Sequence, residues 1–280
     1  MLHPHPGAAR HPHAAVSGTA LALVLAAALL HAAWNRLLHG AADRLAAAAI
    51  GAAAGSVLLA PAIAVFPPWR VWPLVIASGA AEALYFTFLS AAYQRGELSF
   101  TYPVARGMAP FLVTLGGAVL LGQPLTAARI AGSLALGCGL ALISHAGLRS
   151  GRGPAIAFAV LTGLSIAVYS VIDARSVQSV SPLGYLGAVT VVQTVILLAL
   201  ARPGWRRLRS SARDGAGVGI GSLTAYLLVL LAYQRAPASP VATLRELSIL
   251  FGILIARDRS GKAVWAGGAL CVLGAVLVVL

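Results

Sequence analysis

ALYFTFLSAAYQRGELSFTYPVARGMAPFL, residues 83–112, is the stretch of this sequence that most constrains the fold. It contains the end of one apolar run, a short break with Gln, Arg, Gly and Glu, and the start of the next apolar run. Apolar runs of roughly 20 residues, divided by Gly, Pro and Arg, are typical of helices that cross a hydrocarbon layer about 30 Å thick. The same pattern continues in both directions along most of the chain.

The composition excludes a soluble globular protein. The chain has 280 residues, of which 59% are hydrophobic and only 10% are charged, and its mean hydropathy is +0.88. Soluble domains usually contain about 25% charged residues. Ten spans of about 20 residues would use about 200 residues, which leaves no room for a folded domain outside the membrane. The function is therefore expected within the bilayer or at its two surfaces.

We count ten candidate spans in two sets of five. The first set is 16–38, 45–66, 72–93, 104–121 and 127–147, and the second set is 154–173, 182–201, 215–234, 241–256 and 263–280. The first run is too long for the apolar core of a cleaved signal peptide, so we interpret it as a span. Residues 1–15 hold four histidines among prolines, and we expect a disordered tail there rather than a metal site.

The two sets of spans are similar to each other. Tyr93-Gln94-Arg95 at the end of the third span recurs as Tyr233-Gln234-Arg235 at the end of the eighth span, at an offset of 140 residues. Each set has an odd number of spans, so the second copy enters the membrane from the opposite side. The sequence thus predicts an all-α integral membrane protein with ten transmembrane helices in two inverted five-helix repeats, 16–147 and 154–280.

Helices in the fourth and ninth positions have unusual features. Pro110 follows Arg106 by four residues and is expected to disturb the first full turn of its helix. The ninth span, from Val241 to Ala256, has 16 residues and would be about 24 Å long, which is less than the thickness of the hydrocarbon core.

Four ionisable residues lie within spans or at their ends, namely Glu82, Arg106, Arg245 and Glu246. Each would cost roughly 2.5–3.5 kcal/mol at the bilayer centre, so these side chains should face the interior of the bundle. One interpretation is that they form structural ion pairs that hold the two halves together. The other is a substrate or proton site, which is favoured because Arg106 and Arg245 occupy corresponding places in the two repeats.

His31, Trp34 and Asn35 are three and four residues apart and share one face of the first helix, which should point inward because it is polar. His31 fits a core histidine as well as a proton relay, and Trp34 also fits an interfacial residue. In the second half, Tyr169-Ser170 with Asp173 one turn later is again polar and aromatic. The agreement between the repeats favours a lined cavity.

Small residues are frequent in the fifth and tenth spans. Gly132 and Gly139 correspond to Gly267 and Gly274 at an offset of 135 residues. Small residues let helices approach closely, so these faces serve packing within the fold or a homodimer contact. The two cysteines lie in apolar runs and are interpreted as packing residues.

The remaining sequence features exclude several functions. The net charge of +13 comes from arginines scattered singly through short loops, which does not build a nucleic-acid-binding face. No catalytic signature and no phosphate-binding loop occurs, so we expect neither an enzyme nor a cofactor nor a metal. The expected partners are a small-molecule substrate and the lipid bilayer.

HAAWN at 31–35, the stretch 83–112 with the GQP turn at 122–124, and PVATLRELSILFG at 240–252 resemble the EamA-like branch of the drug/metabolite transporter superfamily. The resemblance covers nearly the whole chain. It implies ten helices in two inverted repeats around a central path for a small metabolite or drug. Gln123 stands in the turn where an acidic residue is common in this family.

The predicted function is a secondary transporter, an exporter in the cytoplasmic membrane of a bacterium, that works by alternating access with proton coupling. The predicted substrate-binding residues are Arg106, Arg245, Trp34, Asn35, Tyr85, Tyr102 and Tyr169. Those assigned to proton coupling or charge pairing are Glu82, Glu246 and His31. The alternatives are a membrane-embedded enzyme acting on a lipid-linked substrate, for which the acidic residues are widely dispersed, and a scaffold that does not transport.

Basic residues are distributed unevenly between the two sides of the membrane that ten spans imply. The odd-numbered loops hold 13 lysines and arginines, whereas the N-terminal tail and the even-numbered loops hold five. Because basic loops stay in the cytoplasm, this distribution predicts that both termini face outward. The family resemblance implies the opposite orientation.

Overall fold

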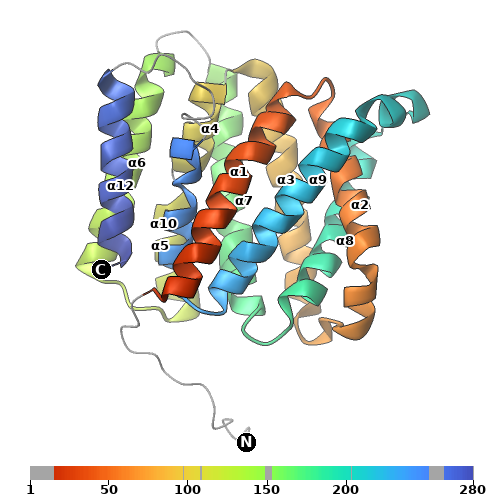
Figure 1. Ribbon diagram of the computed structural model, residues 1–280, viewed down its shortest axis with the longest axis horizontal. Coiled ribbons are helices and arrows are strands. Elements are labelled where there is room, and N and C mark those ends of the chain that lie inside the picture. The colour runs from red at the N-terminus through yellow and green to blue at the C-terminus, as the bar shows by residue number, and fades with distance from the viewer. Residues whose placement is uncertain are drawn as a thin grey trace, which may run out of the picture.

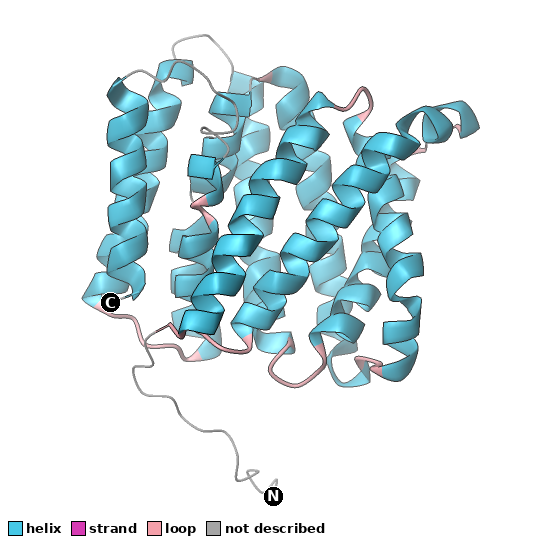
Figure 2. Cartoon of the chain, viewed as in Figure 1, coloured by secondary structure: helices cyan, strands magenta, loops and turns pink. Residues whose placement is uncertain are grey.

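Helices form nearly all of the described chain, and Figure 2 shows no strand in that part of it. The structure is a computed structural model that describes residues 16–96, 98–107, 109–148, 153–202, 204–251 and 262–279. Its helices are α1 (Gly18–Gly40), α2 (Arg44–Val65), the 3₁₀ turn η1 (Trp69–Val71), α3 (Trp72–Arg95), α4 (Leu98–Gly107), α5 (Ala109–Leu121), α6 (Ala127–Leu148), α7 (Gly153–Ser176), α8 (Pro182–Ala201), α9 (Trp205–Tyr233), α10 (Ala238–Arg245) and α12 (Lys262–Val279). The predicted tail, 1–15, lies outside the described residues.

Seven helical segments of the described chain are long and apolar enough to cross a membrane. They are Gly18–Gly40, Arg44–Val65, Trp69–Arg95, Val104–Leu121, Gly153–Ser176, Pro182–Ala201 and Arg206–Tyr233. Two further helices carry shorter apolar stretches, Ala127–Leu142 and Trp265–Val278. The prediction of an all-α protein with several apolar spans is therefore confirmed, whereas the number ten and the inverted repeat stay predictions.

Local sequence signals set where several helices begin. Ser17 caps α1 by accepting a hydrogen bond from the Ala20 amide at 3.2 Å, and Asp43 caps α2 by accepting one from the Ala46 amide at 3.0 Å. These side chains satisfy amide groups that have no partner in the first helical turn. Pro182 begins α8, where its missing N–H costs nothing.

The fourth predicted span is helical on both sides of residue 108, which lies outside the described residues: α4 ends at Gly107 and α5 starts at Ala109. The expected disturbance at Pro110 stays a prediction. The ninth predicted span is interrupted, because α10 ends at Arg245, a turn follows at residues 246–247, and the chain is helical again at 248–251. The rest of that span, 252–256, lies outside the described residues.

The eighth predicted span is longer than expected. The sequence indicates a loop at 202–213, but α9 already begins at Trp205 and continues for 29 residues. After Gly204 the chain holds arginine, leucine, serine and alanine, and nothing among these breaks a helix. The first turns of α9 therefore project beyond the rest of the bundle, as the cyan helix does in Figure 1.

Helices from the two halves of the chain pack against each other. The main pairs are α1 with α9, α3 with α7, α2 with α8, and α6 with α12 (Figure 1). Glycines allow the closest approach between α6 and α12. A Cβ atom on Gly139 would lie 2.5 Å from the Gly267 carbonyl oxygen, and one on Gly132 would lie 2.6 Å from the Gly274 carbonyl oxygen.

These glycines thus serve packing within one chain, which was one of the two uses that the sequence left open. The homodimer contact through the same faces stays a prediction. The pairing of helices across the two halves also positions the side chains that line the interior.

Candidate functional site

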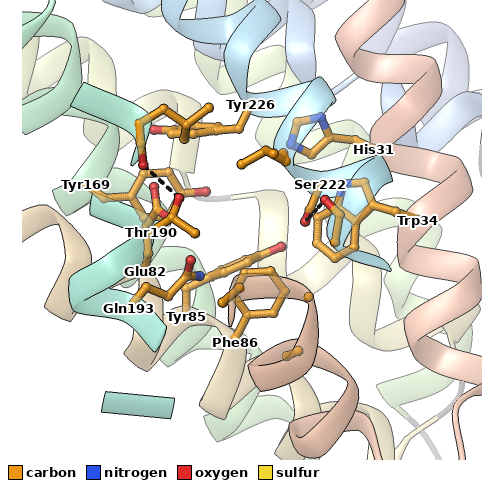
Figure 3. Close-up of a pocket in the computed structure, with 16 residues that line it drawn as sticks. His31, Trp34, Glu82, Tyr85, Phe86, Tyr169, Thr190, Gln193, Ser222 and Tyr226 are labelled. Atoms are coloured by element: carbon orange, nitrogen blue, oxygen red, sulfur yellow. Dashed lines mark hydrogen bonds between the residues drawn. The ribbon is translucent and has the colours of Figure 1, made fainter. Parts of the chain in front are cut away.

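A cavity lined largely by aromatic rings lies inside the bundle, between α1, α2, α3, α7, α8 and α9 (Figure 3). Ring centroids are 5.6 Å apart for Trp34 and Phe86, 5.8 Å for Tyr85 and Tyr169, and 5.5 Å for Tyr169 and Tyr226. These are contact distances for tilted and edge-to-face aromatic pairs. The rings therefore form a continuous apolar wall within the membrane-spanning part of the protein.

Polar groups complete the lining of this cavity. They are His31, Glu82, Thr190, Gln193 and Ser222. The cavity has a volume of about 50 Å³, which is enough for a few water molecules but not for an organic substrate. The helices around it have to separate before a larger molecule can enter.

Glu82 is the acidic residue among those lining residues. Its side chain projects from α3, and only 8% of the residue is exposed. Its Oε1 atom has no hydrogen-bond partner among the described residues. A buried polar atom without a partner costs about 1–3 kcal/mol, so this oxygen is available to a proton, a cation or a donor group.

Arg106 and Glu246 form a buried ion pair between the two halves of the chain. The Arg106 Nε atom lies 2.5 Å from Glu246 Oε2, and its Nη2 atom lies 2.9 Å from Oε1. This two-point contact is the geometry that guanidinium and carboxylate groups prefer. Arg106 is thereby neutralised by a carboxylate of the same chain, as the structural interpretation of these charges expects.

Arg245 is fully buried but less completely bonded. Its Nη2 atom donates to the Ser170 hydroxyl at 3.3 Å, and its Nε atom lies 3.7 Å from Glu246 Oε1, which is beyond hydrogen-bond distance. Nε and Nη1 have no hydrogen-bond partner among the described residues. Arg245 therefore retains donor groups for an additional anionic or carbonyl group.

Asp173 is a buried carboxylate that the sequence prediction did not include among the site residues. It accepts hydrogen bonds from the hydroxyl groups of Ser78 at 2.5 Å, Tyr185 at 2.7 Å, and Tyr226. The three donors come from α3, α8 and α9, and Asp173 comes from α7. Its position inside an apolar span was a visible signal, but its partners are 95, 12 and 53 residues away. Tyr226 links this cluster to the cavity wall.

Asn35 and Tyr102 brace the helices and do not line the cavity. The Asn35 amide donates to the His31 carbonyl at 2.8 Å, and its oxygen accepts a hydrogen bond from the Tyr93 hydroxyl at 2.8 Å. The Tyr102 hydroxyl donates to Ser248 at 2.9 Å, and its ring lies 5.6 Å from the Arg106 guanidinium.

The structure thus divides the predicted site residues into two groups. Those that line the cavity are His31, Trp34, Glu82, Tyr85 and Tyr169, and those that lie outside its lining are Asn35, Tyr102, Arg106, Arg245 and Glu246. The sequence prediction missed the lining residues Phe86, Thr190, Gln193, Ser222 and Tyr226. Gln193 could have been suspected, because it is an amide in the middle of an apolar span. Whether any of these residues binds a substrate stays a prediction.

Comparison with known proteins gives a family for the second half of the chain. Residues 153–280 match the model of the EamA-like transporter family. Residues 153–280 are therefore similar to an EamA-like domain. The predicted resemblance is confirmed over these residues, and together with the apolar helices the match supports a multi-pass membrane protein.

A solved crystal structure has a similar fold along nearly the whole chain. It aligns with a TM-score of 0.71 over 92% of this chain and 96% of that chain, at 21% sequence identity. At this level of identity the similarity concerns the fold alone. The comparison with curated proteins gave no match.

Proposed function

We propose that this protein is a secondary transporter that exports a small metabolite or drug across the cytoplasmic membrane of a bacterium, coupled to protons. The observation that carries the proposal is the aromatic cavity with Glu82, whose Oε1 atom has no partner among the described residues. An ionisable group within a membrane-spanning segment is expensive, and such groups mark transport paths and proton relays.

The proposed substrate contacts are the cavity-lining rings of Trp34, Tyr85 and Tyr169, together with Arg245 just outside the lining. The rings offer apolar and quadrupolar surface, and Arg245 offers two nitrogen atoms, Nε and Nη1, that have no partner in the described part of the chain. We propose Glu82 and His31 as the proton-coupling residues, because both line the cavity. Arg106 and Glu246 would hold the two halves together as a closed ion pair.

Ten helices in two inverted repeats are part of the proposal. In the two proposed repeats, α1, α2, α3 and α6 correspond to α7, α8, α9 and α12. The helix contacts support this symmetry: when each helix is replaced by its counterpart, the α1–α9 contact becomes the α7–α3 contact, and the α2–α8 and α6–α12 contacts stay the same. The small cavity volume supports alternating access, since the substrate enters only when one set of helices moves relative to the other.

Glu82→Gln provides the first test. Proteoliposomes that contain a pH-sensitive dye would be exposed to a panel of amines, carboxylic acids and amino acids. We expect at least one compound to cause a proton flux with the unmodified protein and none to do so with the variant, because the amide cannot carry a proton.

Asp43→Asn is the matched control. Asp43 is a carboxylate at a helix start outside the cavity, and asparagine caps helices equally well. Its flux should equal that of the unmodified protein. A flux that persists in Glu82→Gln would overturn the role of Glu82, and the absence of any compound-dependent flux or tracer movement in the unmodified protein would contradict the transporter proposal.

A further inference from the structure

A second and larger cavity opens at the end of the bundle that carries the loops 122–126 and 234–237, along the lower edge of Figure 1. Its volume is about 500 Å³, which lies in the range of sites for small organic molecules. Its walls come from the end of α5 and the loop after it, the start of α6, the end of α7, the end of α9 and the start of α10.

Three arginines from different elements line this cavity, namely Arg129, Arg175 and Arg235. Its described lining contains no acidic residue. Each guanidinium donates to a backbone carbonyl: Arg129 to Pro124 at 2.8 Å, Arg235 to Leu231 at 2.7 Å, and Arg175 to Leu120 at 3.5 Å.

These hydrogen bonds hold the arginines without neutralising them. Each side chain uses one nitrogen for a carbonyl, while a guanidinium has five N–H groups. None of the three has a carboxylate partner in the described part of the chain, in contrast to Arg106 with Glu246 and Arg207 with Asp43. The cavity therefore combines three positive charges with unused donors.

Amide side chains fix the shape of the cavity. Gln178 at the end of α7 donates to the Tyr233 carbonyl at 2.8 Å, and Gln234 donates back to the Val177 carbonyl at 2.9 Å. In the loop after α5, the Gln123 oxygen accepts a hydrogen bond from the Ala238 amide at 3.1 Å. These hydrogen bonds join α7 to α9 and the loop after α5 to α10. The elements around the three arginines are therefore held together by hydrogen bonds.

The lining of this cavity includes a buried tyrosine. Tyr233 is only 2% exposed, so the cavity reaches the interior of the bundle at this point.

We propose that the cavity lined by Arg129, Arg175 and Arg235 binds the phosphate or carboxylate groups of a small multivalent anion. Its role as an entry or exit site rests on the proposed transport function, whereas the binding itself does not. Two sources can supply such groups, a soluble anion or the headgroup of an anionic phospholipid.

Binding of inorganic pyrophosphate and of citrate to the purified full-length protein tests the proposal. The protein would be kept in an uncharged detergent at low salt, because screening weakens exposed charges. We expect saturable binding by calorimetry. Each of Arg175→Gln and Arg235→Gln should weaken binding about fivefold, as expected for the loss of one exposed charge contact of about 1 kcal/mol.

Arg70→Gln is the matched control, because Arg70 is exposed on η1 and does not line the cavity. Its affinity should be unchanged. A second arm measures thermal stabilisation by phosphatidylglycerol and by phosphatidylcholine. Pyrophosphate or citrate binding that depends on Arg175 and Arg235 assigns a soluble anion, and stabilisation by phosphatidylglycerol alone with the same dependence assigns a headgroup.

The proposal is overturned if calorimetry shows no saturable binding of pyrophosphate or citrate and phosphatidylglycerol gives no thermal stabilisation. It is also overturned if the double variant Arg175→Gln/Arg235→Gln gives the same result as Arg70→Gln. Glu82→Gln separates this outcome from a failure of the proposed function. That variant should lose transport but keep pyrophosphate affinity, because Glu82 lines the other cavity.

Discussion

Buried charged side chains define the interior of this protein, and three of them differ in how they are satisfied. Arg106 is neutralised by Glu246 in a two-point ion pair. Asp173 accepts hydrogen bonds from three hydroxyl groups, which spread its charge without a cation. Glu82 has an oxygen without a partner among the described residues. The first two arrangements hold helices together, and the third is the one that remains open to a proton or a substrate.

Replacing one member of the Arg106–Glu246 pair should cost more stability than replacing both. Arg106→Met leaves the Glu246 carboxylate buried without its two-point partner, which typically costs about 3–5 kcal/mol. Arg106→Met/Glu246→Met removes both charges, and methionine fills irregular space well. We expect the single variant to lower the melting temperature strongly in a thermal unfolding assay in detergent and the double variant to regain most of the loss.

This comparison also distinguishes the two interpretations of the pair. A double variant that is stable and still transports assigns a structural role. If it is stable but inactive, the pair takes part in transport directly. Equal stability of the single variant and the unmodified protein would contradict the buried ion pair itself.

At the scale of the helices, the contact between α6 and α12 depends on glycines seven residues apart in each helix. Gly132 lies opposite Gly274, and Gly139 lies opposite Gly267. A seven-residue spacing returns to nearly the same helical face after two turns, so both glycines of one helix meet the partner helix. Close approach of this kind replaces the hydrophobic driving force that is missing between helices in lipid.

Gly139→Ala and Gly137→Ala should therefore differ, although they lie two residues apart in α6. A Cβ atom at position 139 would lie 2.5 Å from the Gly267 carbonyl oxygen, a distance that forces the helices apart. At position 137 the nearest atom would be 3.7 Å away, which is ordinary contact. We expect Gly139→Ala to lower the melting temperature and Gly137→Ala to leave it unchanged or raise it slightly, since alanine favours helix. Equal melting temperatures would show that α6 and α12 are not packed this closely.

At the scale of the whole molecule, the two ends of the bundle differ in charge. The odd-numbered loops, which include the arginines at the start of α9, hold 13 basic residues, against five on the other side. Arg206, Arg209 and Arg213 are exposed on the projecting part of α9. Such residues stay in the cytoplasm and interact favourably with anionic lipid headgroups.

We therefore expect both termini to face away from the cytoplasm. A reporter fused after Leu280 that is active only in the cytoplasm should be inactive in cells, and a reporter active only outside should give a signal. The same cytoplasmic reporter in the loop after α8 is the control and should be active. Cytoplasmic activity of the C-terminal fusion would show that the charge distribution does not set the orientation here.

The sequence alone determined the class of protein and most of its elements. Apolar runs of the right length gave the positions of α1, α2, α3, α6, α7, α8 and α12 to within about three residues, because hydropathy and capping residues act locally. The sequence likewise identified Glu82, Arg106, Arg245 and Glu246 as interior residues, since an ionisable side chain in an apolar span is too costly to expose to lipid.

Only the tertiary structure decided how these residues are used. Arg106 meets a carboxylate 140 residues away, and the cavity takes Thr190, Gln193 and Tyr226 from α8 and α9. Apart from a few polar positions such as His31 and Asn35, the faces of these transmembrane helices are apolar, so periodicity does not say which face points inward. That choice depends on the rotation and contact of helices distant in sequence, and it decides which buried charge is neutralised and which remains open.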